Sequence, residues 1–97
     1  MDIQVSPRMP GTVSVSAGVV EAHKVIRASG MKHTLHPMGT CIEGEPALLY
    51  ELASAIHCKL VELGYSRIGM YIKVDERLDK QQTMDDKVAR VSDLLNL

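Results

Sequence analysis

The run KHTLHPMGTCIE, residues 32–43, constrains the fold more than any other part of this chain. Residues 31–36 and 40–43 each have the length and composition of a short strand. Pro37-Met38-Gly39, between them, has the residue types of a tight turn. Because so short a connection joins antiparallel neighbours, these segments predict a β-hairpin near the middle of the chain.

Helical periodicity flanks this hairpin on both sides. Before it, an apolar stripe runs towards Gly30, a residue type that commonly follows a helix end: Val15, Val19, Ala22 and Ile26. After it, Pro46 suits the first turn of a helix, and a second stripe runs to Gly64: Leu48, Leu49, Leu52, Ile56, Leu60 and Leu63. The pattern therefore predicts a helix on each side of the hairpin.

Two further strands and a last helix complete the pattern. Residues 67–75 alternate cleanly between apolar and polar side chains, which predicts a strand. Residues 2–6 predict a shorter strand that ends at the prolines of PRMPGT. Thr83 and Asp86 have the spacing of a capping box, with Asp in place of Glu, ahead of a last apolar stripe: Met84, Val88, Val91, Leu94 and Leu95.

The resulting order, βαββαβ followed by α, predicts an α+β fold of the ferredoxin-like type over a single domain, residues 1–97. We expect an antiparallel four-stranded sheet with helices on one face and an additional C-terminal helix. The open sheet face would carry the polar side chains of the strand at 67–75, which we interpret as an oligomer face: Arg67, Tyr71, Lys73 and Asp75.

Composition excludes several classes of function. The net charge is −1, so no basic patch favours nucleic acid as a partner. No apolar run approaches the roughly 20 residues that span a bilayer, so no membrane partner is expected. No leader is visible at the N-terminus, and we expect a cytoplasmic protein. Cys41 and Cys58 stand singly, and we interpret both as buried thiols.

Patterns of catalytic or metal-binding residues are weak. The four histidines show no spacing typical of metal ligands, and His33 and His36 point to opposite faces of their strand. No metal is therefore expected. Phosphate-binding glycine loops are absent from the sequence. Glu43 and Glu45 are either a general acid and base or, more simply, a solvated strand end and a helix N-terminus carboxylate.

Three segments together resemble a known family. SGMKHTLHPMGTCIEGE, YSRIGMYIKVDERLDK and DKVARV are similar to motifs of the thiamine-binding protein family, also described as uncharacterised protein family 45 or the YkoF-like group. The likeness covers about residues 14–92, and PMGTxIEG is its most specific part. It implies a ferredoxin-like subunit, a homo-oligomer that is typically a dimer of dimers, and binding of thiamine or its hydroxymethylpyrimidine part. It implies neither a catalytic activity nor a cofactor.

This resemblance makes residues 36–45 the expected border of a ligand site. Thiamine carries a cationic thiazolium and an aminopyrimidine, which need a flat apolar wall, a hydroxyl and acceptors. Met38 would supply the wall, Thr40 the hydroxyl, and Glu43 and Glu45 the acceptors. The chain departs from the family at Cys41, where Thr or Val is more usual, and in the loop after the first strand, which reads PRMPGT. There, Arg8 either favours an anionic ligand such as a thiamine phosphate or contributes only to solubility.

Two other functions are weighed against thiamine binding. A structural or regulatory homo-oligomer would use its polar sheet face to bind another subunit. A small hydrolase of acyl phosphates or phosphate esters would use Arg8 after the first strand, as the ferredoxin-like acylphosphatases do. Pro7 and Pro10 flank Arg8 and remove two backbone donors from any phosphate cradle, which disfavours the hydrolase.

Overall fold

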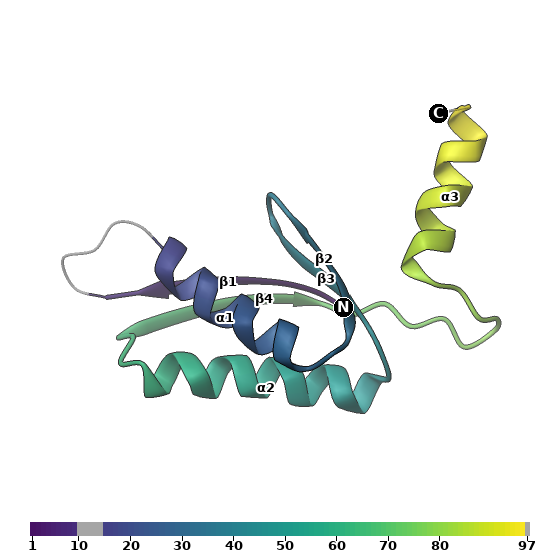
Figure 1. The fold of residues 1–97 in the computed structure, drawn as a ribbon. Coiled ribbons are helices and arrows are strands. Elements are labelled where there is room, and N and C mark those ends of the chain that lie inside the picture. The colour runs from purple at the N-terminus through teal and green to yellow at the C-terminus, as the bar shows by residue number, and fades with distance from the viewer. Residues whose placement is uncertain (10–14, 97) are drawn as a thin grey trace.

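The computed structural model describes residues 1–9 and 15–96, which form a four-stranded antiparallel sheet and three helices (Figure 1). The elements in chain order are β1 (Asp2–Arg8), α1 (Ser16–Ala28), β2 (Lys32–His36), β3 (Gly39–Glu43), α2 (Pro46–Glu62), β4 (Arg67–Lys73) and α3 (Met84–Leu95). The strand order is β2-β3-β1-β4. Helices α1 and α2 cover one face of the sheet (Figure 1). This is the predicted ferredoxin-like α+β fold with an additional C-terminal helix.

Strand alternation separates a core face from an open face. Ile3 pairs with Ile72 and Val5 with Met70, so each pair shares a face of the sheet. Ile3 belongs to the core, and Val5 and Met70 pack against it. Their neighbours point the other way, so the residues opposite Asp2 and Gln4, namely Lys73 and Tyr71, lie on the open face as predicted. The buried core is aliphatic: Ile3, Ala22, Ile26, Ile42, Leu49, Leu52, Ala53, Ile56 and Leu60.

Strand β1 is longer than the sequence predicts. It continues through Pro7 and Arg8, which pair with Ile68 and Arg67 of β4. On its other side, β1 pairs with β3 only at Asp2 and Ile3. Among the described residues no strand pairs with Pro7 on this side, so its missing N–H falls on an open edge, where proline is tolerated.

Strand β4 is shorter than predicted and ends at Lys73 rather than residue 75. Lys73 pairs with Asp2, the first residue of β1, so the ladder between the two strands ends at this pair. Cys58 also differs from the prediction of a buried thiol. It is exposed on α2, because it lies two residues from the buried Ile56 and points away from the core.

Helix α3 stands away from the body of the fold (Figure 1). The predicted capping box is confirmed, because Thr83 and Asp86 each accept a hydrogen bond from the other's backbone N–H. Met84, the first residue of α3, donates its backbone N–H to the Glu43 carboxylate at 2.8 Å, and Asp85 of α3 forms an ion pair with Lys32. None of its residues is buried. Four side chains of its apolar stripe are between 55% and 67% exposed: Val88, Val91, Leu94 and Leu95.

Among the described residues, no helix combines the length and the apolar character that crossing a membrane requires.

Candidate functional site

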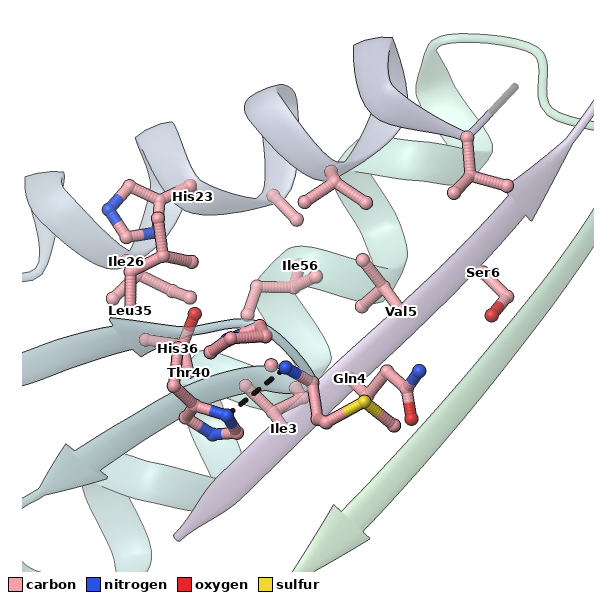
Figure 2. A pocket seen from close by; sticks show the side chains of 16 residues that line it. Ile3, Gln4, Val5, Ser6, His23, Ile26, Leu35, His36, Thr40 and Ile56 are labelled. Carbon is pink, nitrogen blue, oxygen red and sulfur yellow. Dashed lines mark hydrogen bonds between the residues drawn. The ribbon is translucent and has the colours of Figure 1, made fainter.

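A cavity of about 210 Å³ lies between α1 and the sheet (Figure 2). Strand β1 and helix α1 form its two long sides, and the β2–β3 turn forms one end. Its lining is mostly apolar, with polar groups contributed by His23, Thr40 and His36 among others. A mostly apolar cavity with a few polar groups is the usual character of a small-molecule site.

The cavity exists because β3 and β1 pair only briefly. The amine of Met1 donates to the carbonyl of Ile42, and the N–H of Ile42 donates to the carbonyl of Met1, both at 2.7 Å. Backbone groups alternate in direction along an antiparallel strand, so those of Val5 point to the same side as those of Met1. No described strand pairs with Val5 on that side. Val5 thus presents one N–H and one C=O at the edge that lines the cavity.

His23 adds an unsatisfied polar atom to this lining. Its Nδ1 is buried and has no hydrogen-bond partner among the described residues. The ring packs edge-on against His33, with centroids 5.2 Å apart. His33 is itself fixed, because its Nδ1 donates to the carbonyl of Met31 at 2.8 Å. A buried polar atom without a partner is unfavourable, so the Nδ1 atom of His23 can form a hydrogen bond with a ligand or a water.

The structure separates the four residues predicted to bind ligand. Thr40 is buried and Met38 is 67% exposed, and both line the cavity. Glu43 points to the open face and accepts the hydrogen bond from Met84. Glu45 precedes α2 as its exposed N-cap residue. Alternation along β3 explains the split, because Thr40 and Glu43 are an odd number of residues apart.

The predicted oligomer face is only partly continuous. Arg67, Tyr71 and Lys73 lie on the open face of β4, opposite Arg8, Gln4 and Asp2 of β1. Asp75 follows the strand and forms an ion pair with Lys87 of α3. The hydrogen bond from Lys87, followed by the positive charge of that residue, lowers the pKa of the Asp75 carboxyl. The use of these four residues in assembly stays a prediction.

The loop after the first strand is described only in part. Pro7 and Arg8 are the last residues of β1, so they belong to the sheet rather than to a loop. Pro10, Gly11 and Thr12, in which the chain departs from the family, lie outside the described residues. The hydrolase alternative, which needs Arg8 in a phosphate-binding loop, loses its structural basis because Arg8 pairs with Arg67 in a strand.

The fold also brings close together three side chains that are far apart in the sequence or on different strands. Asp2, His36 and Cys41 place one ligand atom each within 4.8 Å of one another. The hydrogen bond with His36 lowers the pKa of the Asp2 carboxyl, whereas burial and the Asp2 contact raise the pKa of the Cys41 thiol. These residues come from three different strands, so only the register between the strands reveals that their side chains lie close together.

Sequence analysis also missed His23 and Val5 as site residues. His23 stands beside Ala22 on the apolar side of α1, and a histidine on a core-facing side is a signal that could have been used. The part played by Val5 depends on its backbone and on strand pairing, for which no residue pattern exists.

Comparison with known proteins identifies the family. The model of the family described as thiamine-binding protein matches residues 1–92. The chain is 41% identical over 88 residues to UPF0045 protein ECM15 of Eremothecium gossypii, covering 91% of this chain and 84% of that protein. It is 36% identical over 95 residues to UPF0045 protein YqgV of Bacillus subtilis, covering 94% and 91% respectively. The solved structure of MJ1052 from Methanocaldococcus jannaschii matches with a TM-score of 0.84 at 25% identity, over 94% of this chain and 92% of that one. The chain therefore belongs to the thiamine-binding protein family.

Proposed function

We propose that this protein binds thiamine or its hydroxymethylpyrimidine part in the cavity beneath α1, as a cytoplasmic homo-oligomer that catalyses no reaction. The family description supports binding rather than catalysis. Both cysteines are free thiols, which fits a reducing compartment. The observation that carries the proposal is the edge of β1 at Val5, with which no described strand pairs, inside a mostly apolar cavity.

The edge at Val5 matches the chemistry of an aminopyrimidine. Such a ring presents an amine donor beside a ring-nitrogen acceptor, and Val5 offers a C=O and an N–H side by side. His23 Nδ1 is available for the remaining ring nitrogen or for the hydroxymethyl group. We propose that the exposed Met38 supplies the apolar wall and the buried Thr40 the hydroxyl, since both residues line the cavity.

Cavity size favours the pyrimidine half as the part that is enclosed. Sites for drug-sized ligands occupy about 300–1,000 Å³. The cavity here, at about 210 Å³, is smaller than that range. We therefore propose that the pyrimidine enters while the thiazolium of thiamine stays near the exposed Met38 at the mouth.

Thermal unfolding against thiamine, thiamine phosphate, hydroxymethylpyrimidine and sulfate tests this proposal. A ligand at 100 times its Kd adds about 2.7 kcal/mol to the free energy of unfolding, which raises the Tm by more than about 10 °C in a domain of this size. We expect a rise with thiamine and with the pyrimidine alone. A rise with none of these ligands, measured at millimolar concentration, contradicts the proposal.

Matched variants locate the site. Thr40→Val and His23→Leu are expected to weaken binding of hydroxymethylpyrimidine, because each removes a polar group from the cavity. Glu43→Gln is the control, since Glu43 lies on the opposite face of the sheet. Unchanged affinity in Thr40→Val and His23→Leu, with a loss in Glu43→Gln, would place the ligand at the acceptors expected from sequence and not in the cavity.

A structural homo-oligomer is the alternative, and α3 is the observation that favours it. Four large apolar side chains on one exposed helix are expected to be covered by another copy of the chain. We propose that α3 and the open sheet face together build a dimer of dimers. Val91→Asp is expected to lower the mass measured by sedimentation equilibrium, as are Tyr71→Ala and Lys73→Glu. An unchanged mass in all three variants argues against this assembly.

A further inference from the structure

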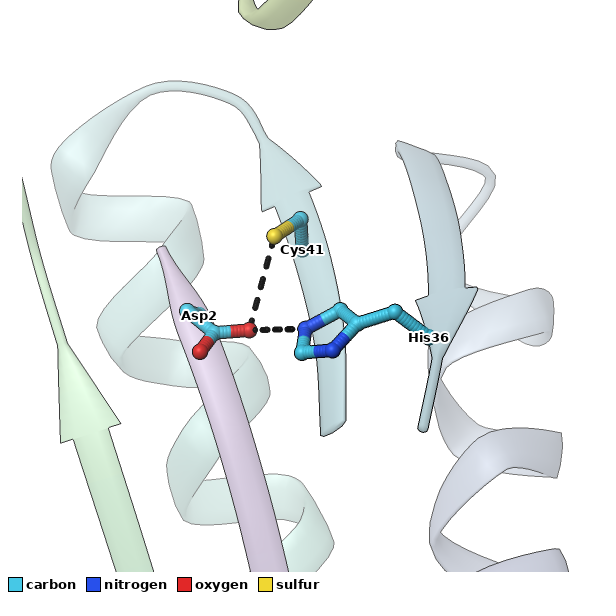
Figure 3. A group of neighbouring side chains, drawn as sticks. All are labelled: Asp2, His36 and Cys41. Carbon is cyan, nitrogen blue, oxygen red and sulfur yellow. Dashed lines mark hydrogen bonds and ion pairs between the residues drawn. The ribbon is translucent and has the colours of Figure 1, made fainter. Parts of the chain in front are cut away.

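A compact group of three different ligand types lies on the open face of the sheet, and one of its members, His36, also lines the cavity. Asp2 from β1, His36 from β2 and Cys41 from β3 point towards one another (Figure 3). The Asp2 Oδ1 atom lies 2.7 Å from His36 Nε2 and 3.4 Å from Cys41 Sγ. All three side chains are partly exposed, so solvent reaches the group.

Strand register holds the group in place. Asp2 pairs directly with Cys41, and Cys41 pairs with Thr34 of β2. His36 lies two residues beyond Thr34 on the same face, at a diagonal position from which a long side chain can reach. Its ring orientation is fixed as well, because the N–H of Met38 donates to Nδ1 at 3.2 Å. Nε2 therefore carries the ring proton and donates it to Asp2.

We propose that Asp2, His36 and Cys41 form a binding site for Zn²⁺ or a similar borderline divalent cation. Imidazole nitrogen, thiolate sulfur and carboxylate oxygen are the three ligand types that Zn²⁺ accepts in proteins. Three protein ligands leave the fourth tetrahedral position open to water or to another molecule. The geometry of this group carries the inference without the thiamine proposal, although His36 also lines the cavity.

One of the separations already matches a tetrahedral site, and all three ligand atoms lie within 4.8 Å of one another. Zinc bonds of about 2.0–2.3 Å separate tetrahedral ligand atoms by about 3.3–3.6 Å. The Asp2–Cys41 separation of 3.4 Å falls within this range. The Asp2–His36 separation of 2.7 Å is that of a hydrogen bond, and has to open by about 0.6 Å as the cation replaces the proton.

Binding has a definite proton balance. The thiol of Cys41 loses its proton and becomes a thiolate ligand. Nε2 of His36 releases its proton to bind the cation, and Nδ1 takes up one proton, so the imidazole stays neutral. Once Nδ1 is protonated, it no longer accepts the hydrogen bond from Met38. The backbone N–H of Met38 is therefore a second, independent reporter of cation binding.

Titration of untagged, reduced protein with Co²⁺ tests the site, because cobalt replaces zinc and reports its ligands by absorption. We expect one equivalent to produce the intense near-ultraviolet charge-transfer band of a Co²⁺–thiolate bond. Cys41→Ser should abolish this band and weaken Zn²⁺ binding in calorimetry by at least about tenfold. Cys58→Ser is the matched control, since Cys58 is the other free thiol and lies exposed on α2. It should leave both signals unchanged.

Three results would overturn the proposal: no thiolate band at one equivalent of Co²⁺, a band that survives Cys41→Ser, or a band that is lost in Cys58→Ser. Asp2→Asn keeps the size of the side chain but removes its charge, and it should weaken Zn²⁺ binding while the protein stays folded by circular dichroism. In ¹⁵N spectra, Zn²⁺ should shift the Met38 amide in the wild type and leave it in place in Cys41→Ser. Because these measurements use no organic ligand, they succeed or fail independently of thiamine binding.

Discussion

Replacement of Gly39 by alanine is expected to be among the most disruptive single changes outside the aliphatic core. A Cβ atom at this position would lie 2.5 Å from the carbonyl oxygen of Ile3 and 3.2 Å from its carbonyl carbon. Both neighbours are backbone atoms of the central strand, so a side-chain rotation cannot relieve the overlap. Gly39 also has a φ of 155°, which residues with a side chain rarely adopt.

The magnitude follows from these two effects. Positive φ costs an alanine about 1–2 kcal/mol, and forcing an extra methyl group into a packed site costs typically about 1–3 kcal/mol. We therefore expect Gly39→Ala to lower the free energy of unfolding by about 3 kcal/mol. In a domain of this size, that corresponds to a fall in Tm of roughly 15 °C, measured by circular dichroism or calorimetry.

Gly30→Ala is the matched control for this prediction. Gly30 has a φ of 73°, but a Cβ there would meet no atom within 4 Å. It should therefore show only the backbone effect, about 1–2 kcal/mol. If Gly39→Ala is no more destabilising than Gly30→Ala, the close approach of the β2–β3 turn to Ile3 is refuted, and with it the described end of the cavity.

Three further predictions follow from individual contacts. Ile56 is fully buried, so Ile56→Ala should lower the free energy of unfolding by about 2–5 kcal/mol in urea denaturation, whereas Ile56→Val should lower it by about 0.5–1.5 kcal/mol. Equal losses in the two variants would argue against a packed core at this position. Thr83→Ala removes the side-chain cap of α3 and should speed hydrogen exchange in its first turn by the equivalent of about 1 kcal/mol, without changing exchange in α2. The pKa values of Asp75 and Asp86 are lowered, mainly by the hydrogen bonds from Lys87 and from the Thr83 backbone respectively. A carboxyl with a lowered pKa stabilises the fold above its unfolded pKa, and this stabilisation is lost as pH falls through the folded pKa. The α3 amide signals should therefore begin to move only below about pH 4. Movement between pH 5 and 7 would contradict the assignment.

Local patterns were sufficient to predict the fold, because each element carries its own signal. The alternation at 67–73, the hairpin at Pro37–Gly39 and the helix ends at Gly30 and Gly64 all lie in the structure as the residue types indicate. The misplaced ends of β1 and β4 have another cause. Whether Pro7 is tolerated, and where β4 stops, depends on which neighbour each strand has, and a single sequence does not contain that information.

The candidate site was harder to predict than the fold for the same reason. Met38 and Thr40 line the cavity because they belong to the hairpin that the motif identifies. Glu43 shares that motif but lies on the opposite face, since strand alternation separates residues that are close in sequence. Asp2 and Cys41 are 39 residues apart and meet only through the β1–β3 register.

His36 contributes to both faces of the sheet, since it lines the cavity and also forms a hydrogen bond with Asp2 on the opposite side. The N–H of Met38, a second cavity residue, is bonded to the same ring. Thermodynamic linkage between two sites is reciprocal. Any molecule that repositions this imidazole from one face must change the affinity of the other face, and by the same factor in each direction. If both proposed sites bind their ligands, this one ring at the end of β2 couples them.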